Sequence, residues 1–118
     1  MASDKTPIHR QEDNELLGYI KPAGNDQWEP QTIFGYPLAA VASRADAIAV
    51  LKNRGLDVLM DTWQFYDSSE GDWYNCRIVE AHEDTVRITI TDYGHPHSHQ
   101  TRLLTHPTAD ILGLQANR

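Results

Sequence analysis

Apolar and polar residues alternate most clearly over residues 57–93, where three β-rich runs are separated by two polar turns. The apolar positions of the last run are two residues apart: Val86, Ile88 and Ile90. One face of that strand should therefore be buried and the other solvated. The middle run repeats the pattern with Tyr74, Cys76 and Ile78 on one face. Together the runs predict an antiparallel meander that is stable only if its apolar face is covered.

A helix is predicted before the meander. Ser43 has the character of an N-cap, with the acidic Asp46 in the first turn. The segment Arg44–Arg54 is rich in helix-forming apolar residues and ends before Gly55, a residue that often terminates helices. Its apolar arc is broad, so we expect this helix to lie across a sheet.

Two extended runs precede the helix. Leu16–Lys21 and Trp28–Leu38 are separated by Pro22–Asp26, which has the composition of a chain reversal. After Gly94 the pattern becomes irregular, with a short helix predicted over Pro107–Leu112. Leu56–Asp61 fits helical as well as extended spacing.

These elements predict an α+β fold: a mostly antiparallel sheet of about five strands, an N-terminal hairpin plus the C-terminal meander, packed against one principal helix. We expect one domain over residues 16–114. Residues 1–15 are predicted to be a flexible N-terminal tail and residues 115–118 a C-terminal tail.

Composition limits the class of protein. The chain has 118 residues, 40% hydrophobic and 23% charged, which is ordinary globular usage. A net charge of -7 and scattered Lys and Arg argue against binding to nucleic acid, which requires a concentrated basic face. Cys76 is the only cysteine, and no apolar run could span a bilayer or serve as a signal peptide. We therefore expect a cytoplasmic protein with no membrane or nucleic-acid partner.

Part of the chain resembles a pattern in small uncharacterised actinobacterial proteins. The likeness covers about Leu17–Val79 and rests on the segments Gly18–Ile20 and Trp28–Leu38 and on Gly, aromatic and Leu positions up to Trp63. It implies a bacterial setting and carries no activity. The meander also resembles the strand runs of SH3-like and Tudor-like barrels, but the helix and the long first hairpin depart from that plan, so the helix-on-sheet reading is favoured.

Three histidines form the one constellation with chemical content: His95, His97 and His99. In an extended segment, alternate residues lie on one face about 7 Å apart, close enough for neighbouring imidazoles to share a divalent metal such as zinc. The intervening Pro96 and Ser98 indicate a loop instead, and solvated histidines in a loop need no metal. A loop that responds to pH is a third reading.

Other catalytic chemistry has little support. Cys76 lies on the face of its strand that carries Tyr74 and Ile78, which indicates core packing rather than a reactive thiol. The acidic residues of the turn 67–72 are read as solvated. Nucleotide-binding glycine motifs are absent from the sequence.

The aromatic residues point to a different class of function, because they are too numerous to be buried behind one helix. We predict a binding or dimerisation surface formed by Trp63, Tyr66, Trp73 and Tyr93. The leading interpretation is a noncatalytic protein-interaction module that binds another protein or itself. The alternative is a metal-binding protein, possibly a hydrolase, that uses the histidine loop.

Overall fold

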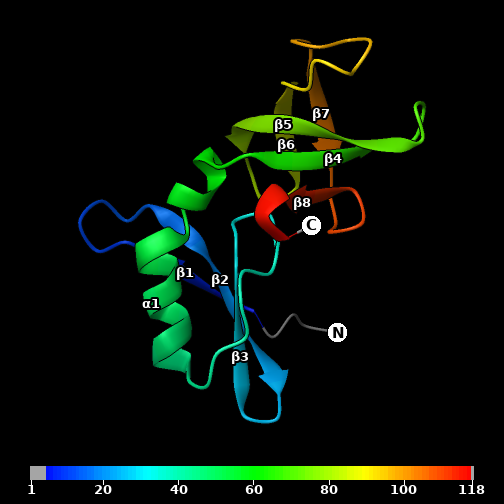
Figure 1. Ribbon diagram of the computed structural model, residues 1–118. Helices are drawn as coiled ribbons and strands as arrows, with labels where there is room; N and C mark the ends of the chain where they lie inside the picture. Colours follow the sequence, from blue (N-terminus) through cyan, green and yellow to red (C-terminus); the bar gives the residue numbers. More distant parts are fainter. Residues whose placement is uncertain (1–4, 118) are drawn as a thin grey trace. The chain divides into compact units, whose positions relative to one another are not determined.

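The computed structural model describes residues 5–117, and the chain divides into two compact units, Met1–Val58 and Leu59–Arg118 (Figure 1). The predicted α+β class with antiparallel pairing is confirmed, but the single sheet is wrong. Unit 1 has a three-stranded sheet and unit 2 a separate five-stranded sheet. The sequence predicted one domain over residues 16–114, whereas the compact units divide after Val58. The predicted hairpin and meander each gained further strands, so neither needed the other to complete its sheet.

Unit 1 contains the helix and the first sheet. Its strands, in the order β1-β2-β3, and its helix have these bounds: β1 Thr6–His9, β2 Leu16–Gly24, β3 Gln27–Gln31 and α1 Arg44–Arg54. The 3-10 helix η1 (Asp57–Met60) spans the point of division.

Helix α1 agrees with the sequence analysis at both ends. The Ser43 side chain accepts a hydrogen bond from the Asp46 N–H, and Gly55 follows the last helical residue. Gly55 has a right-handed φ of -54°, so a left-handed cap is not the reason for this glycine. A Cβ at this position would lie 2.5 Å from the Leu17 carbonyl oxygen, too close for any side chain. Glycine is therefore required by the close approach of two backbones.

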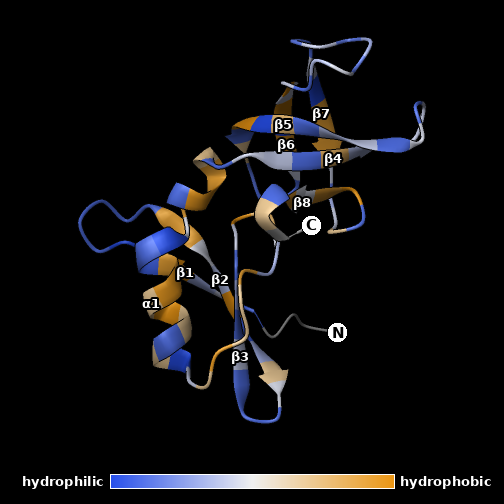
Figure 2. Cartoon of the chain, in the orientation of Figure 1, coloured by the Kyte–Doolittle hydropathy of each residue, from blue (hydrophilic) through white to orange (hydrophobic). Residues whose placement is uncertain are grey.

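The core of unit 1 forms between α1 and β2. Leu17, Ile20, Ala47 and Leu51 are buried together, and partly buried side chains including Ile8 and Trp28 surround them. In Figure 2 the α1 ribbon changes between orange and blue along its length, as expected for a helix with one face on a sheet. This part of the predicted helix-on-sheet arrangement is confirmed.

The N-terminal region differs from the predicted tail. Thr6–His9 form β1, which pairs antiparallel with β2, and Ile8 packs on the core. A four-residue strand is too short to show a period in the sequence, and its pairing depends on the edge that β2 offers. The second predicted strand is also shorter than expected, because the chain turns after Gln31 and Gly35 adopts φ +90°.

Unit 2 is built on the predicted meander. Its strands are β4 Trp63–Asp67, β5 Asp72–Ala81, β6 Thr85–Ile90, β7 Thr101–Thr105 and β8 Leu112–Leu114, in the spatial order β7-β6-β5-β4-β8. The last strand returns to pair with the first, with Trp63 opposite Leu114 and Phe65 opposite Leu112. The inward-facing positions form the core of the unit: Trp63, Phe65, Cys76, Val86, Ile88, Ile90, Leu112 and Leu114.

The segment after Gly94 is where sequence and structure differ most. It contains β7 and β8 in place of the predicted short helix over Pro107–Leu112, and Gln115–Asn117 form the 3-10 helix η2. In β7 the less exposed face carries Arg102 as well as Leu104, while Leu103 on the other face is 52% exposed. Because an arginine at an inward position interrupts the period-two pattern of apolar residues, that pattern does not predict this strand.

No helix within residues 5–117 is both long enough and apolar enough to cross a membrane.

Candidate functional site

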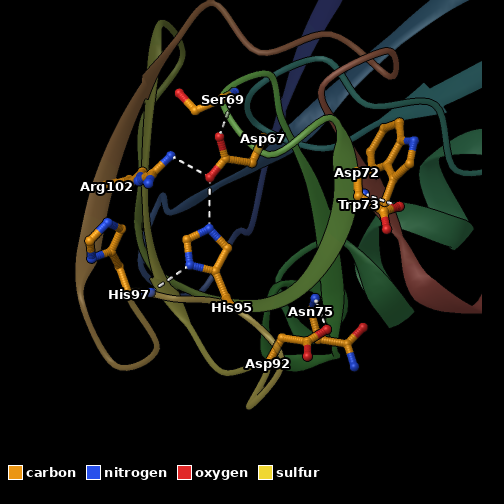
Figure 3. Close-up of polar contacts among 9 residues, drawn as sticks. All are labelled: Asp67, Ser69, Asp72, Trp73, Asn75, Asp92, His95, His97 and Arg102. Atoms are coloured by element: carbon orange, nitrogen blue, oxygen red, sulfur yellow. Dashed lines mark hydrogen bonds and ion pairs between the residues drawn. The ribbon is translucent and has the colours of Figure 1, made fainter.

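Asp67, the last residue of β4, contacts three other segments at one end of unit 2. The period of the strand turns its side chain inward, where the residue is 3% exposed. Its Oδ2 lies 2.7 Å from His95 Nε2 and 2.9 Å from Arg102 Nη1, and its Oδ1 accepts the Ser69 N–H at 2.9 Å (Figure 3). One carboxylate thus joins the β4–β5 turn, the loop after β6 and strand β7.

The hydrogen bonds of His95 fix its tautomer. Nδ1 accepts the backbone N–H of His97 at 2.9 Å, so this nitrogen carries no proton. Nε2 then carries the hydrogen and donates it to Asp67, which leaves the imidazole neutral. The ring is fully buried, with its centroid 4.5 Å from that of Tyr74 in an edge-on arrangement and 5.9 Å from that of Phe65.

The Asp67 carboxylate is stable as an anion in this environment. Burial by itself would raise its pKa, but the hydrogen bonds from His95 and Ser69 and the charge of Arg102 outweigh burial and lower the pKa. The Arg102 guanidinium also lies 5.7 Å from the centre of the Phe65 ring. With a neutral imidazole, the cluster holds one negative and one positive charge, so it is balanced.

The ring nitrogens of His95 both have hydrogen-bond partners within the protein. Both nitrogens of His95 are engaged and buried, so the imidazole could accept a proton or a metal only by breaking a bond that holds the loop. Asp67 and His95 therefore fasten loop 94–100 to the sheet.

Of the three histidines predicted to bind zinc, His95 and His97 lie near each other, with ring centroids 5.9 Å apart. His97 and His99 are exposed, and the ring of His99 lies against Tyr93, 6.0 Å between centroids. In the part of the chain that the structure describes, no group of three or more His, Cys, Asp or Glu side chains is placed to hold a metal ion. The prediction assumed an extended segment, but the loop turns, with Ser98 N–H bonded to the His95 carbonyl oxygen and φ +74° at His99. The turn therefore leaves His97 near His95 but directs the His99 ring toward Tyr93.

The four predicted aromatic surface residues separate into two groups. Trp63 does not belong to a surface, since it is 0% exposed and pairs in register with Cys76 on β5 and Leu114 on β8. The strand has aromatic residues on both faces, so composition alone could not show which ring was inside. Tyr66 and Tyr93 are exposed, at 39% and 88%, and Trp73 is half-buried.

Tyr66 and Trp73 form a cross-strand pair on the outer face of the sheet. They are directly opposite in the β4–β5 register, with ring centroids 5.6 Å apart in a T-shaped geometry. In Figure 3 the Trp73 side chain points away from the Asp67 cluster, on the other side of the ribbon.

Ile111 extends this aromatic pair on the opposite side of Tyr66. The Tyr66 N–H donates to the Ile111 carbonyl oxygen at 2.8 Å, which continues the β4–β8 register, and Ile111 is 38% exposed. We call the row Ile111, Tyr66 and Trp73 the outer patch. Three exposed carboxylates stand next to it in sequence or in the adjoining turn, and we call them the acidic rim: Glu70, Asp72 and Asp110.

Sequence reasoning missed Asp67, Arg102 and Ile111. Only Asp67 could have been found from the sequence, because it follows Trp63 and Phe65 at the same two-residue spacing in β4. The sequence analysis instead assigned it to the solvated turn. Arg102 and Ile111 lie in or beside strands that the sequence pattern did not predict.

The remaining chemical candidate, Cys76, lies in the core as predicted. It is 0% exposed, and burial raises the pKa of its thiol to about 12. The thiol is therefore protonated at neutral pH and unreactive.

Unit 1 has a surface depression lined by Arg10, Gln11, Glu12, Leu17 and Lys52. The Arg10 guanidinium is already paired with Asp13, at 2.7 Å. The depression therefore offers no free pair of cations to an anionic ligand.

No protein-family model, curated protein or solved structure matches this chain.

Proposed function

We propose that the protein is a noncatalytic interaction module and that the outer patch of unit 2 is the surface that contacts a partner protein. The observation that carries the proposal is the Tyr66–Trp73 pair, in which an exposed Tyr66 ring and a half-buried Trp73 ring are placed edge to face on paired strands. Aromatic rings on a rigid sheet supply contact area at a low cost in side-chain entropy, which is why they are frequent among the residues that dominate binding energy.

The cluster of Asp67, His95 and Arg102 also supports a noncatalytic role. Asp67 and His95 have the residue types of an acid–base pair, but their polar atoms are used to hold the loop and the strand together. The reduced, buried Cys76 fits a cytoplasmic setting, which we retain as part of the proposal. The metal-binding alternative, possibly a hydrolase, has less support because His95 is already fully hydrogen-bonded.

The test is a comparison of binding by three purified proteins: wild type, Tyr66→Ala/Trp73→Ala, and the control Leu103→Ala. Leu103 is an exposed apolar residue on the same sheet that lies outside the outer patch. Proteins captured from cell extract are identified, purified and measured again by calorimetry. We expect the Kd of the reconstituted complex to rise about 30-fold or more in the double variant, as for loss of a binding hot spot, and to stay unchanged in Leu103→Ala. Equal binding by wild type and the double variant would overturn the proposal.

A further inference from the structure

We propose that the partner presents a basic segment, in which a Lys or Arg side chain adjacent to an apolar residue is bound by the outer patch and its acidic rim. This inference rests on the proposed function and specifies the chemistry of the partner. It depends on two separate observations, the geometry of the rings and the distribution of charge around them.

The charge of unit 2 is strongly asymmetric. Residues 59–118 contain nine Asp and Glu against four Arg and no Lys, which accounts for -5 of the total charge of -7. Three of the nine carboxylates form the acidic rim, and all three are exposed. The Asp72 carboxylate accepts the N–H of Trp73 at 2.8 Å, so one negative charge is held directly beside the indole-bearing residue.

Within residues 59–117, the three arginines of unit 2 have partners other than the acidic rim. Arg87 Nε lies 3.3 Å from Glu80 Oε1. Arg102 faces the interior and is paired with Asp67. Arg77 lies further along β5, where its Nη1 donates to the Met60 carbonyl oxygen at 3.3 Å. The field of the rim is felt by a neighbouring group: burial first, and then the charges of Glu70 and Asp72, raise the pKa of the Tyr74 phenol.

A basic side chain matches both features of the surface. Its charged group is attracted to the face of a Trp or Tyr ring and to carboxylates, while its methylene stem covers apolar surface. Ile111, on the far side of Tyr66, offers a contact for an apolar neighbour in the bound segment. The three residues lie side by side across adjacent strands, so an extended segment could cross them in one direction.

A second copy of this chain fits the same surface poorly. A two-fold symmetric contact places each surface against itself. The rims of both copies would then be brought into one interface without a basic group from either outer patch, and like charges brought together there are unfavourable. The basic partner is therefore favoured over the homodimer that the aromatic content alone allowed.

The experiment uses the full-length protein to select binders from a displayed library of random 12-residue peptides. Selected peptides are synthesised, and their Kd values are measured by fluorescence polarisation against wild type and two charge-matched triple variants. The first variant neutralises the rim: Glu70→Gln/Asp72→Asn/Asp110→Asn. The control neutralises three exposed carboxylates outside the rim, Asp61 before β4 and Glu83 and Asp84 in the β5–β6 turn: Asp61→Asn/Glu83→Gln/Asp84→Asn.

We expect peptides enriched in Lys or Arg beside an apolar residue, with Kd raised at least 10-fold by the rim variant and less than 3-fold by the control, and a further loss of binding at high salt. Replacing the basic residue of the peptide by Gln should reproduce the loss. Peptides that lose binding in Tyr66→Ala/Trp73→Ala but show no basic preference would overturn this inference and leave the proposed function intact. Peptides that bind all variants equally, or no selection above background, would count against both.

Discussion

The two faces of the β4–β5 pair lie in different environments, one buried and one in contact with solvent, although alternate residues of the same strands form them. On the inner face, Asp67 and His95 are buried, and the partly buried Arg102 pairs with Asp67. On the outer face, one residue away in each strand, Tyr66 and Trp73 form a partly exposed aromatic pair. The residue types usually associated with chemistry are enclosed, and those usually associated with a core face the solvent.

This contrast shows why residue type is an unreliable guide to role in a small sheet domain. A buried carboxylate requires partners for each of its oxygens, and an imidazole and a guanidinium supply them. Conversely, aromatic rings left on a solvated face cost little when they pack edge to face, and they remain available for contact. The predictions that follow test whether the inner face is structural and the outer face is not.

The largest effect is expected from removing the carboxylate. Asp67→Ala leaves the Ser69 N–H, the His95 Nε2–H and the partly buried Arg102 without their acceptor. We expect unit 2 to lose about 3–5 kcal/mol of stability, as when one member of a buried ion pair is removed. Urea unfolding followed by labelling of the buried Cys76 thiol measures this unit selectively. The exposed Asp110→Asn should change stability by less than about 0.5 kcal/mol.

The second effect separates two histidines that are two residues apart. His95→Ala removes a fully buried ring and should cost about 2–4 kcal/mol, whereas His97→Ala removes an exposed ring and keeps the backbone N–H, so we expect less than about 0.5 kcal/mol. Thermal unfolding with and without zinc measures both. Similar losses in the two variants, or stabilisation of wild type by stoichiometric zinc that either variant abolishes, would instead favour the metal site.

The third effect depends on pH. The pKa of Asp67 is lower in the folded protein than its ordinary value of 3.8, so its ionised form stabilises the fold. That contribution is complete well above pH 3.8 and is lost as pH falls through the lower, folded pKa. The stability difference between wild type and Asp67→Asn should therefore be constant above about pH 5 and shrink at lower pH. A difference that grows on acidification would contradict the assigned direction.

The smallest effect concerns the outer face. A double-mutant cycle of Tyr66→Ala and Trp73→Ala should give a coupling energy of about 0.5–1.5 kcal/mol, the value of an aromatic pair. The Tyr93–His99 contact provides a control, because its rings are further apart, 6.0 Å, and Tyr93 is 88% exposed. Its coupling should be smaller. A coupling above about 3 kcal/mol for Tyr66 and Trp73 would make that pair part of the core rather than a contact surface.

The amino-acid sequence by itself determined the local elements. The start of α1 follows from the hydroxyl of Ser43, and the meander follows from the period of two in β5 and β6. Cys76 was assigned to the core because its strand neighbours on that face are apolar. These features depend on residues close together in the chain, so the pattern contains the information that they need.

Only the tertiary structure decided which groups meet. The Asp67–His95 bond joins residues 28 apart, and Arg102 on β7 pairs with the same carboxylate. Likewise, Trp63 and Tyr66 are both aromatic, and what placed one inside and the other outside was the pairing of β4 with β5 and β8. Burial and hydrogen bonding of polar side chains depend on partners that are distant in sequence. The amino-acid sequence alone does not show which of these residues come together in the fold.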